Sequence, residues 1–150
     1  MAQSLSRVLL HVVFSTKGRR LYIPPDLGPE LYAYLASVCR TMGCDAYRVG
    51  GEEEHVHIAS SLARTIAVSD LVGELKRSSS AWLKARDDRC RDFRWRAGYG
   101  VFSVGQSELD NLIRYIENQK EHHATRSFEE EIIDLFDRND IEYDERYLWD

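Results

Sequence analysis

The stretch Cys44-Asp45-Ala46-Tyr47-Arg48-Val49-Gly50-Gly51-Glu52-Glu53-Glu54-His55-Val56-His57-Ile58-Ala59-Ser60-Ser61-Leu62 decides the fold of this chain. Apolar and β-branched residues on both sides of a glycine- and glutamate-rich centre predict two strands, residues 44–49 and 55–62, joined by the polar turn 50–54. A strand and a helix are predicted before this pair, and a helix and a strand after it. The pair is therefore the centre of a β-α-β-β-α-β order.

The outer elements follow from their hydrophobic spacing. Residues 8–14 predict a buried strand, and Leu31, Tyr34 and Leu35 recur at helical spacing in a helix at residues 30–42. A second helix is predicted at residues 68–86 and a fourth strand at residues 98–104. This order is that of the ferredoxin-like split βαβ fold, an α+β fold with a four-stranded antiparallel sheet and helices on one face.

Two further helices are predicted beyond the fourth strand. Ser107 is a suitable N-cap for an amphipathic helix that runs on to His123. Ser127 and Glu130 form a capping box that opens a last helix at residues 128–138. We expect residues 1–126 to form one domain that includes the helix 107–123. Residues 127–150 are expected to be an acidic C-terminal helix and tail packed on the same domain.

The charge of the chain is divided unevenly. Its 150 residues fit one domain, and the net charge of -5 argues against a nonspecific nucleic-acid binder, which usually has a basic surface. Residues 127–150 hold 10 acidic and 2 basic side chains, however, whereas residues 1–126 hold 15 acidic and 18 basic ones. The acidic sign therefore belongs to the C-terminal segment, and a low pI of about 5.6 is compatible with DNA binding on one face.

The sequence gives no indication of a membrane or a secreted location. Residues 1–15 lack a charged segment followed by a cleavable apolar stretch, and no apolar run approaches the ~18 residues that span a bilayer. Three cysteines are an odd number for a secreted disulfide framework. We expect a soluble, cytoplasmic protein with no membrane partner.

Positive charge gathers between Lys76 and Arg96, where eight basic side chains stand against three acidic ones. Phe93 and Trp95 lie among them, and basic residues interleaved with aromatic rings suit contact with phosphates and stacking of bases. A solvated helix end and loop is the alternative for any single residue. The residues that we expect to bind DNA are Lys76, Arg77, Lys84, Arg89, Arg91, Arg94, Trp95 and Arg96, with Arg19 and Arg20 adding to them.

The motif His55-Val56-His57 carries the first indication of chemistry. Side chains alternate along a strand, so both imidazoles project from one face, and two neutral imidazoles this close form half of a divalent-metal site. Two unrelated histidines on a partly exposed strand would give the same pattern. A zinc site built from Cys39, Cys44 and His55 fits less well, because Cys39 falls in a predicted helix.

The helix 107–123 offers a partner for this strand. Tyr115, Gln119 and His122 follow one another at i, i+4 and i+7 and line one stripe beside the apolar face. Tyr115 is then a candidate nucleophile, and the Gln119 amide oxygen a candidate third ligand of the metal. Attack by a phenol on a phosphodiester polarised by the metal would give a phosphotyrosyl link. A tyrosine at the margin of the core and a solvated glutamine are the alternative.

In their order along the chain, these motifs resemble the single-tyrosine HUH transposases, the TnpA-type enzymes of insertion-sequence-two-hundred-like elements. The paired histidines alone are a weak indication, whereas the ordered set is specific and spans nearly the whole chain. The matching motifs are His11-Val12-Val13-Phe14-Ser15-Thr16-Lys17, His55-Val56-His57, Lys76-Arg77-Ser78-Ser79-Ser80-Ala81-Trp82, Gly98-Tyr99-Gly100-Val101-Phe102-Ser103-Val104, Tyr115-Ile116-Glu117-Asn118-Gln119 and Ile141-Glu142-Tyr143-Asp144-Glu145-Arg146-Tyr147-Leu148-Trp149.

The resemblance implies a site, a cofactor and partners. His55, His57 and Gln119 would bind Mg²⁺ or Mn²⁺, and Tyr115 would be the nucleophile of a catalytic domain at residues 1–126. The substrate would be single-stranded DNA with hairpin ends, cleaved and rejoined through 5′-phosphotyrosine intermediates during DNA transposition. A homodimer is implied, in which the tyrosine helix can complete the partner's metal site.

Two other functions remain open from the sequence. One is a catalytically inactive or domesticated protein of the same fold that binds single-stranded or hairpin DNA. The other is a ferredoxin-like RNA-binding module, which would be indifferent to the loss of His57.

Overall fold

The computed structural model describes residues 2–145. Its strands are β1 (Leu9–Ser15), β2 (Ala46–Glu52), β3 (His55–Ser61) and β4 (Gly100–Val104). Its α-helices are α1 (Gly28–Thr41), α2 (Val68–Arg86), α3 (Leu109–Glu117), α4 (Gln119–His123) and α5 (Phe128–Arg138). The order confirms the predicted α+β fold. Within the described residues, no helix has the length and apolar character that a membrane span requires.

The four strands form one antiparallel sheet in the order β2-β3-β1-β4. The strand β3 is central and carries both histidines of the paired motif. Its register places His57 opposite Val13 of β1 and opposite Gly50 of β2. The two histidines therefore lie in the middle layer of the molecule, with a strand on each side.

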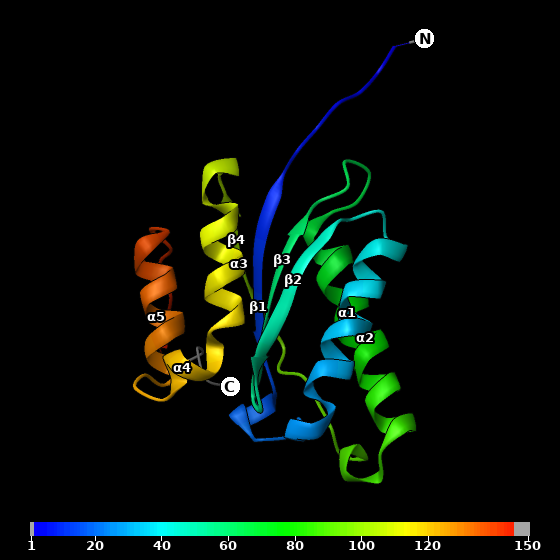
Figure 1. Cartoon of the computed structure of the whole chain (residues 1–150), viewed down its shortest axis with the longest axis vertical. Helices are drawn as coiled ribbons and strands as arrows, with labels where there is room; N and C mark the ends of the chain where they lie inside the picture. The colour runs from blue at the N-terminus through cyan, green and yellow to red at the C-terminus, as the bar shows by residue number, and fades with distance from the viewer. Residues whose placement is uncertain (1, 146–150) are drawn as a thin grey trace.

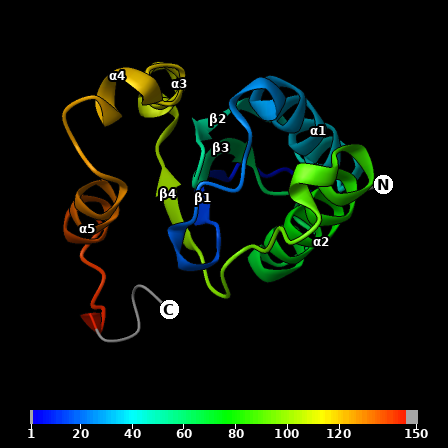
Figure 2. The same cartoon turned by 90° about the horizontal axis from the view of Figure 1, so that it is seen from below.

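Helices cover both faces of this sheet (Figures 1 and 2). On one face, α1 and α2 pack on Val56 and Ile58 in the main apolar core. On the other face lie α3, α4 and α5, where Ala59 contacts α3 and Val13 contacts α5. The sequence predicted the first helical layer and left the position of the appended helices open; the structure places them over the face from which His55 and His57 project.

Gly50 and Gly51 belong to the strand β2. The sequence predicts Gly50 and Gly51 in the turn, but β2 continues to Glu52 and only Glu53 and Glu54 connect it to β3. A Cβ atom on Gly51 would lie 2.1 Å from the His55 carbonyl oxygen, and one on Gly50 would lie 2.9 Å from the Ile116 carbonyl oxygen. The glycines thus allow β3 and α3 to approach β2 closely.

The predicted helix 107–123 is divided into two. It begins at Leu109, after a short 3-10 turn at Gln106–Glu108, and its N-cap is Glu108 and not the predicted Ser107. At Asn118 the backbone leaves helical geometry, with φ -98° and ψ 22°, and α4 starts at the next residue. This break turns Gln119 into the interior, where it is buried.

The last helix begins as predicted. Ser127 and Glu130 form the expected capping box, in which the Glu130 N–H donates to Ser127 Oγ over 3.2 Å. Phe128 and Ile132 of α5 pack against Val13 and Phe102 of the sheet. The part of the tail motif from Arg146 onward lies outside the described residues.

Candidate functional site

A cluster of buried polar side chains lies where α3, α4 and α5 meet the sheet. β1 contributes His11, β3 contributes His55 and His57, α4 contributes Gln119 and α5 contributes Glu131, and all are at most 4% exposed. Polar groups this deeply buried are costly unless they have partners. Their concentration at one place therefore makes this cluster the candidate functional site.

The Glu131 carboxylate is the common partner in this cluster. One oxygen, Oε1, lies 2.9 Å from His57 Nε2, 3.2 Å from His123 Nε2 and 3.4 Å from His55 Nε2. The other oxygen, Oε2, accepts from Gln119 Nε2 over 3.0 Å and from the Tyr115 hydroxyl. A single acidic side chain thus contacts every residue that the sequence analysis assigned to chemistry.

The protonation states follow from these contacts. Burial by itself would raise the pKa of Glu131, but the neighbouring His57 and His123 outweigh it and hold that pKa well below its usual value. Burial and the Glu131 charge raise the pKa of the Tyr115 phenol. Burial lowers the pKa of His57 despite the nearby carboxylate. The site thus holds an ionised Glu131 and a protonated Tyr115.

In both histidines of the paired motif, the second ring nitrogen, Nδ1, also has a hydrogen-bond partner. His55 Nδ1 donates to Glu54 Oε1 over 2.5 Å, and His57 Nδ1 lies 2.7 Å from His11 Nε2. Hydrogen bonds of this kind fix the tautomer and ring orientation of metal-binding histidines. Burial and the proximity of His57 lower the pKa of His11, so a neutral His11 can accept a hydrogen bond from His57 Nδ1–H.

These donor atoms fit a divalent metal. One donor atom each from His55, His57 and Glu131 lies within 4.8 Å of the others. Because Nδ1–H of His55 is donated to Glu54, its Nε2 lone pair faces the Gln119 amide oxygen at 2.8 Å, and a cation would satisfy both. Two imidazoles with oxygen ligands suit several first-row divalent ions, Mn²⁺ among them.

The structure brings Tyr115 and Gln119 to the paired histidines, although α4 is a separate helix from α3. The Tyr115 ring lies 5.7 Å from the His57 ring and 4.7 Å from His122, which completes the predicted stripe. All of these residues come from one chain. Cys39 and Cys44 are free thiols in the core on the opposite face of the sheet, away from the face that carries the histidines.

Four residues of the site were not predicted from the sequence, namely His11, Glu54, His123 and Glu131. A histidine within an otherwise apolar strand was a usable indication for His11. Glu131 gave none, because it follows Glu129 and Glu130 in a segment that reads as a solvated acidic face. Its contact with His57 spans 74 residues and depends on how α5 folds back over the sheet.

Most of the residues predicted to bind DNA line one groove of about 650 Å³ beside α2. The predicted residues in its lining are Lys76, Arg77, Lys84, Arg94, Trp95 and Arg96. Arg20 lies with Arg94 in an adjoining hollow of about 310 Å³. The other three lie elsewhere: Arg19 pairs with Glu129 of α5, Arg89 with Asp26 and Asp87, and Arg91 is exposed outside both linings.

Two residues of this groove also hold its shape. Trp95 packs edge-on against Phe14 and Phe93, and its Nε1–H donates to Ser79 Oγ over 2.8 Å. The Lys76 ammonium donates to the carbonyl oxygens of Arg96 and Gly98 over 2.8 and 2.6 Å. Burial and the nearby Arg96 lower the pKa of Lys76 to about 8. These contacts attach the loop at residues 87–98 to α2 and so maintain the shape of the groove.

One family of known proteins matches most of the chain. The family model described as "Transposase IS200 like" matches residues 4–119, an interval that contains the paired histidines, Tyr115 and Gln119 and ends before Glu131. A search of curated proteins finds no match.

Two solved structures are similar in fold. One, a candidate transposase from Deinococcus radiodurans R1, has a TM-score of 0.61 and 19% identity over 79% of this chain and 98% of its own. The other, a REP-associated tyrosine transposase bound to a REP hairpin, has a TM-score of 0.57 and 14% identity over 82% of this chain and 74% of its own.

Proposed function

Since this chain belongs to the IS200-like transposase family, we propose that it is a metal-dependent transposase that cleaves and rejoins single-stranded DNA through a covalent link to Tyr115. The observation that carries the proposal is the hydrogen bond of the Tyr115 hydroxyl within the buried group formed by His55, His57 and Glu131. Packing alone does not require a tyrosine hydroxyl to lie beside a carboxylate and two imidazoles in the protein interior.

The reaction is a transesterification. The Tyr115 oxygen attacks the scissile phosphorus, a Tyr–O–P bond to the 5′ side forms, and the bond to the 3′ oxygen breaks. The phenol loses its proton and the released 3′ oxygen gains one, so the product is a 5′-phosphotyrosine and a 3′-hydroxyl. The link keeps the energy of the ester, and rejoining by a 3′-hydroxyl reverses the same exchange.

His55, His57 and Glu131 would hold Mg²⁺ or Mn²⁺, with the Gln119 amide oxygen as a further ligand. When bound, the metal would polarise the phosphate and stabilise the leaving oxygen. Glu131 orients the phenol by accepting its hydrogen bond, and Glu54 and His11 orient the two imidazoles. To reach a phosphate, the Tyr115 hydroxyl must exchange its hydrogen bond with Glu131 for the substrate.

Single-stranded DNA with hairpin ends is the substrate that we propose. The groove lined by Lys76, Arg94 and Arg96 supports it, since basic side chains beside aromatic ones bind single strands. The groove and the metal site lie toward the same end of the sheet, because Ser15 pairs with His55 on one side and accepts from the Arg96 N–H on the other. We place the protein in the cytoplasm, consistent with three free, buried cysteines.

We propose a homodimer in which each protomer carries a complete site. Tyr115, Gln119 and the paired histidines of one chain already lie together, which favours a tyrosine that acts within its own chain. Mixing Tyr115→Phe protein with His57→Ala protein tests this arrangement. Restored cleavage in the mixture would show that the tyrosine acts on the partner's site.

A covalent-adduct assay tests the function. Labelled single strands covering the DNA on both sides of the gene are incubated with the protein and Mn²⁺ or Mg²⁺, and adducts are resolved on denaturing gels. We expect an adduct with the wild type and none with Tyr115→Phe, whereas Tyr99→Phe, at an exposed tyrosine, keeps it. Hairpin binding without any adduct would favour the non-catalytic DNA-binding protein, and an adduct in Tyr115→Phe would refute the assignment of the nucleophile.

A further inference from the structure

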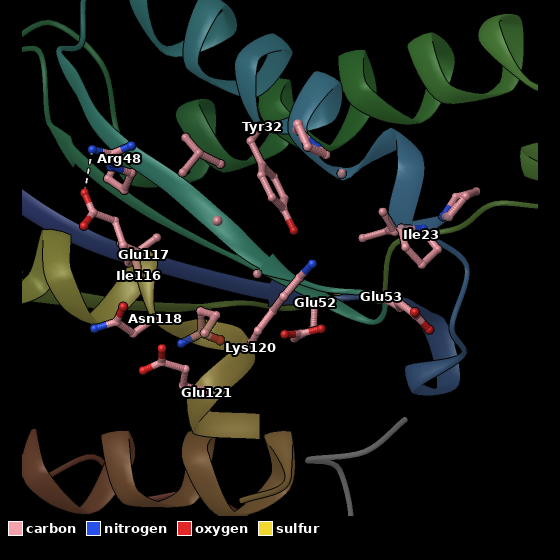
Figure 3. A pocket seen from close by; sticks show the side chains of 18 residues that line it. Ile23, Tyr32, Arg48, Glu52, Glu53, Ile116, Glu117, Asn118, Lys120 and Glu121 are labelled. Carbon is pink, nitrogen blue, oxygen red and sulfur yellow. Dashed lines mark ion pairs between the residues drawn. The ribbon is translucent and has the colours of Figure 1, made fainter. Parts of the chain in front are cut away.

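A second concave site lies at the free edge of β2, and we call it the β2-edge pocket. It has a volume of about 460 Å³ and lies between the start of α1, the outer edge of β2 and the junction of α3 with α4. Figure 3 shows Tyr32 from α1 and Lys120 from α4 extending toward each other across it, with Glu52 at the end of β2 beside them. The volume lies in the range of pockets that hold small organic groups.

The β2-edge pocket is next to the proposed active site. Gln119 lines the pocket and also contacts His55 over 2.8 Å. Glu52, at the pocket, is opposite His55 in the pairing of β2 with β3. Neighbouring strands are about 4.8 Å apart, so the pocket borders the residues that we propose to hold the metal.

The lining combines apolar walls with hydrogen-bonding groups. Ile23, Pro24, Pro29 and Ile116 and the half-buried Tyr32 ring form the apolar part. Because β2 is at the edge of the sheet, alternate residues direct backbone N–H and C=O groups away from β3 and toward the pocket side. Burial and then Glu52 raise the pKa of the Tyr32 phenol to about 12, which agrees with a carboxylate close to the ring.

The charges in the lining disfavour an anionic ligand. Glu52, Glu53, Glu117 and Glu121 outnumber Arg48 and Lys120, and Arg48 is already paired with Glu117 over 2.6 Å. A phosphate inside the pocket would meet excess negative charge. A neutral ring with N–H donors would find an aromatic surface and carboxylate acceptors instead, and carboxylates accept hydrogen bonds from the amino groups of bases.

We propose that the β2-edge pocket binds one unpaired, amino-bearing nucleobase of the DNA strand that Tyr115 cleaves, with Tyr32 as its stacking surface and Glu52 as its acceptor. This inference rests on the function proposed above. Lys120, exposed at the mouth, would contact the backbone of the same nucleotide. At the nucleotide beside the cleaved bond, the pocket would then favour an amino-bearing base over thymine, because thymine lacks the exocyclic amino group.

Binding of short single strands tests the pocket without cleavage. Full-length protein carrying Tyr115→Phe is titrated with fluorescent d(C)6, d(A)6, d(T)6 and an abasic hexamer, and anisotropy is recorded without metal. We expect d(C)6 and d(A)6 to bind about tenfold tighter than d(T)6. Adding Tyr32→Ala should weaken d(C)6 binding about tenfold through lost stacking, and adding Glu52→Gln should bring d(C)6 and d(T)6 within about twofold.

The matched control is Tyr34→Ala, on the same helix but stacked on Trp82 at 5.0 Å, which should leave all affinities unchanged. Ultraviolet crosslinking with 5-iodocytosine in the hexamer, mapped by mass spectrometry, should identify Tyr32. The proposal is overturned if the hexamers bind but the Tyr32 and Glu52 variants bind like their parent, or if the crosslink maps to the groove at Arg94. If either result is found while the wild type still forms the Tyr115 adduct, the pocket proposal fails and the proposed function stands. If no single strand binds and no adduct forms, the pocket proposal and the proposed function both fail.

Discussion

The Tyr115 hydroxyl donates a hydrogen bond to the Glu131 carboxylate, which belongs to a different helix and lies 16 residues further along the chain. The same carboxylate contacts His57 and Gln119. The family match ends at Gln119, so this contact adds α5 to a site whose sequence-predicted members all lie within residues 4–119. The helix α5 is thus structurally part of this cluster.

Replacing Glu131 by glutamine should weaken the fold in a pH-dependent manner. At pH 7 we expect the free energy of unfolding to fall by about 1–3 kcal/mol, because a buried acceptor of several hydrogen bonds loses its charge. The pKa of Glu131 is lowered from an ordinary value of 4.5, so its contribution is complete above about pH 4.5 and is lost as the pH falls below that value. Urea denaturation should therefore show a smaller difference in the free energy of unfolding between the wild type and Glu131→Gln at pH 3 than at pH 7.

The exposed Glu121, on α4, provides the control for that experiment. Glu121→Gln should match the wild type at both pH values. A stability difference for Glu131→Gln that is equal at pH 7 and pH 3 would contradict an ionised Glu131 in the native protein.

Replacing His11 should impair metal binding without touching a ligand. His11 Nε2 lies 2.7 Å from His57 Nδ1, and the two rings are stacked at 5.0 Å, so phenylalanine keeps the packing and removes only the acceptor. We expect His11→Phe to bind Mn²⁺ about 10- to 100-fold more weakly, the usual cost of losing an orienting partner. Isothermal titration calorimetry measures it, with His122→Phe as a control that should bind like the wild type.

Arg94 and Arg89 should differ in their contribution to DNA binding. Arg94 lines the groove beside α2, whereas Arg89 is held by Asp26 and Asp87 over 2.8 Å each. Arg94→Gln should therefore lower the slope of log affinity against log salt for a single strand by about 0.7, as expected for one lost phosphate contact. Arg89→Gln should leave that slope unchanged. Equal effects of both substitutions, measured by anisotropy between low and moderate salt, would refute the groove as the binding surface.

Gly51 should be intolerant of a side chain. An added Cβ would lie 2.1 Å from the His55 carbonyl oxygen, so Gly51→Ala must displace the backbone of the histidine strand. We expect a loss of about 1–3 kcal/mol, typical of overpacking. Gly73→Ala, in the interior of α2, adds a Cβ with no atom within 4 Å other than its own chain neighbours and helix backbone, and should instead stabilise by up to about 1 kcal/mol. Thermal denaturation of the two variants distinguishes these outcomes.

Local patterns were sufficient for the framework of the fold. Alternation along a strand predicted that His55 and His57 share a face, and the capping box at Ser127 predicted the first turn of α5. Each depends on residues at most a few positions apart, which is the range over which periodicity operates. Segment boundaries were less accurate where packing decides: Gly50 and Gly51 read as a turn but form part of β2 because only glycine allows α3 and β3 to approach so closely.

The surface charges illustrate the same division. The sequence located a basic segment at residues 76–96, and most of it lines one groove. Arg89, however, is paired with Asp26, which is 63 residues away. Neutralisation by a distant carboxylate leaves no mark in the local composition, so composition overestimates how many of the arginines are available to DNA.

The sequence by itself determined the order of strands and helices, the face shared by the paired histidines and the candidate nucleophile, since these follow from short-range spacing. Only the tertiary structure decided that Glu131 contacts His57 and Tyr115, that His11 and Glu54 orient the imidazoles, and that a pocket opens at the edge of β2. The contact between Glu131 and His57 joins residues 74 positions apart, and the pocket joins α1 to the junction of α3 with α4. The Glu131 contacts depend on how α5 folds over the second face of the sheet, and no periodic pattern in the chain predicts that path.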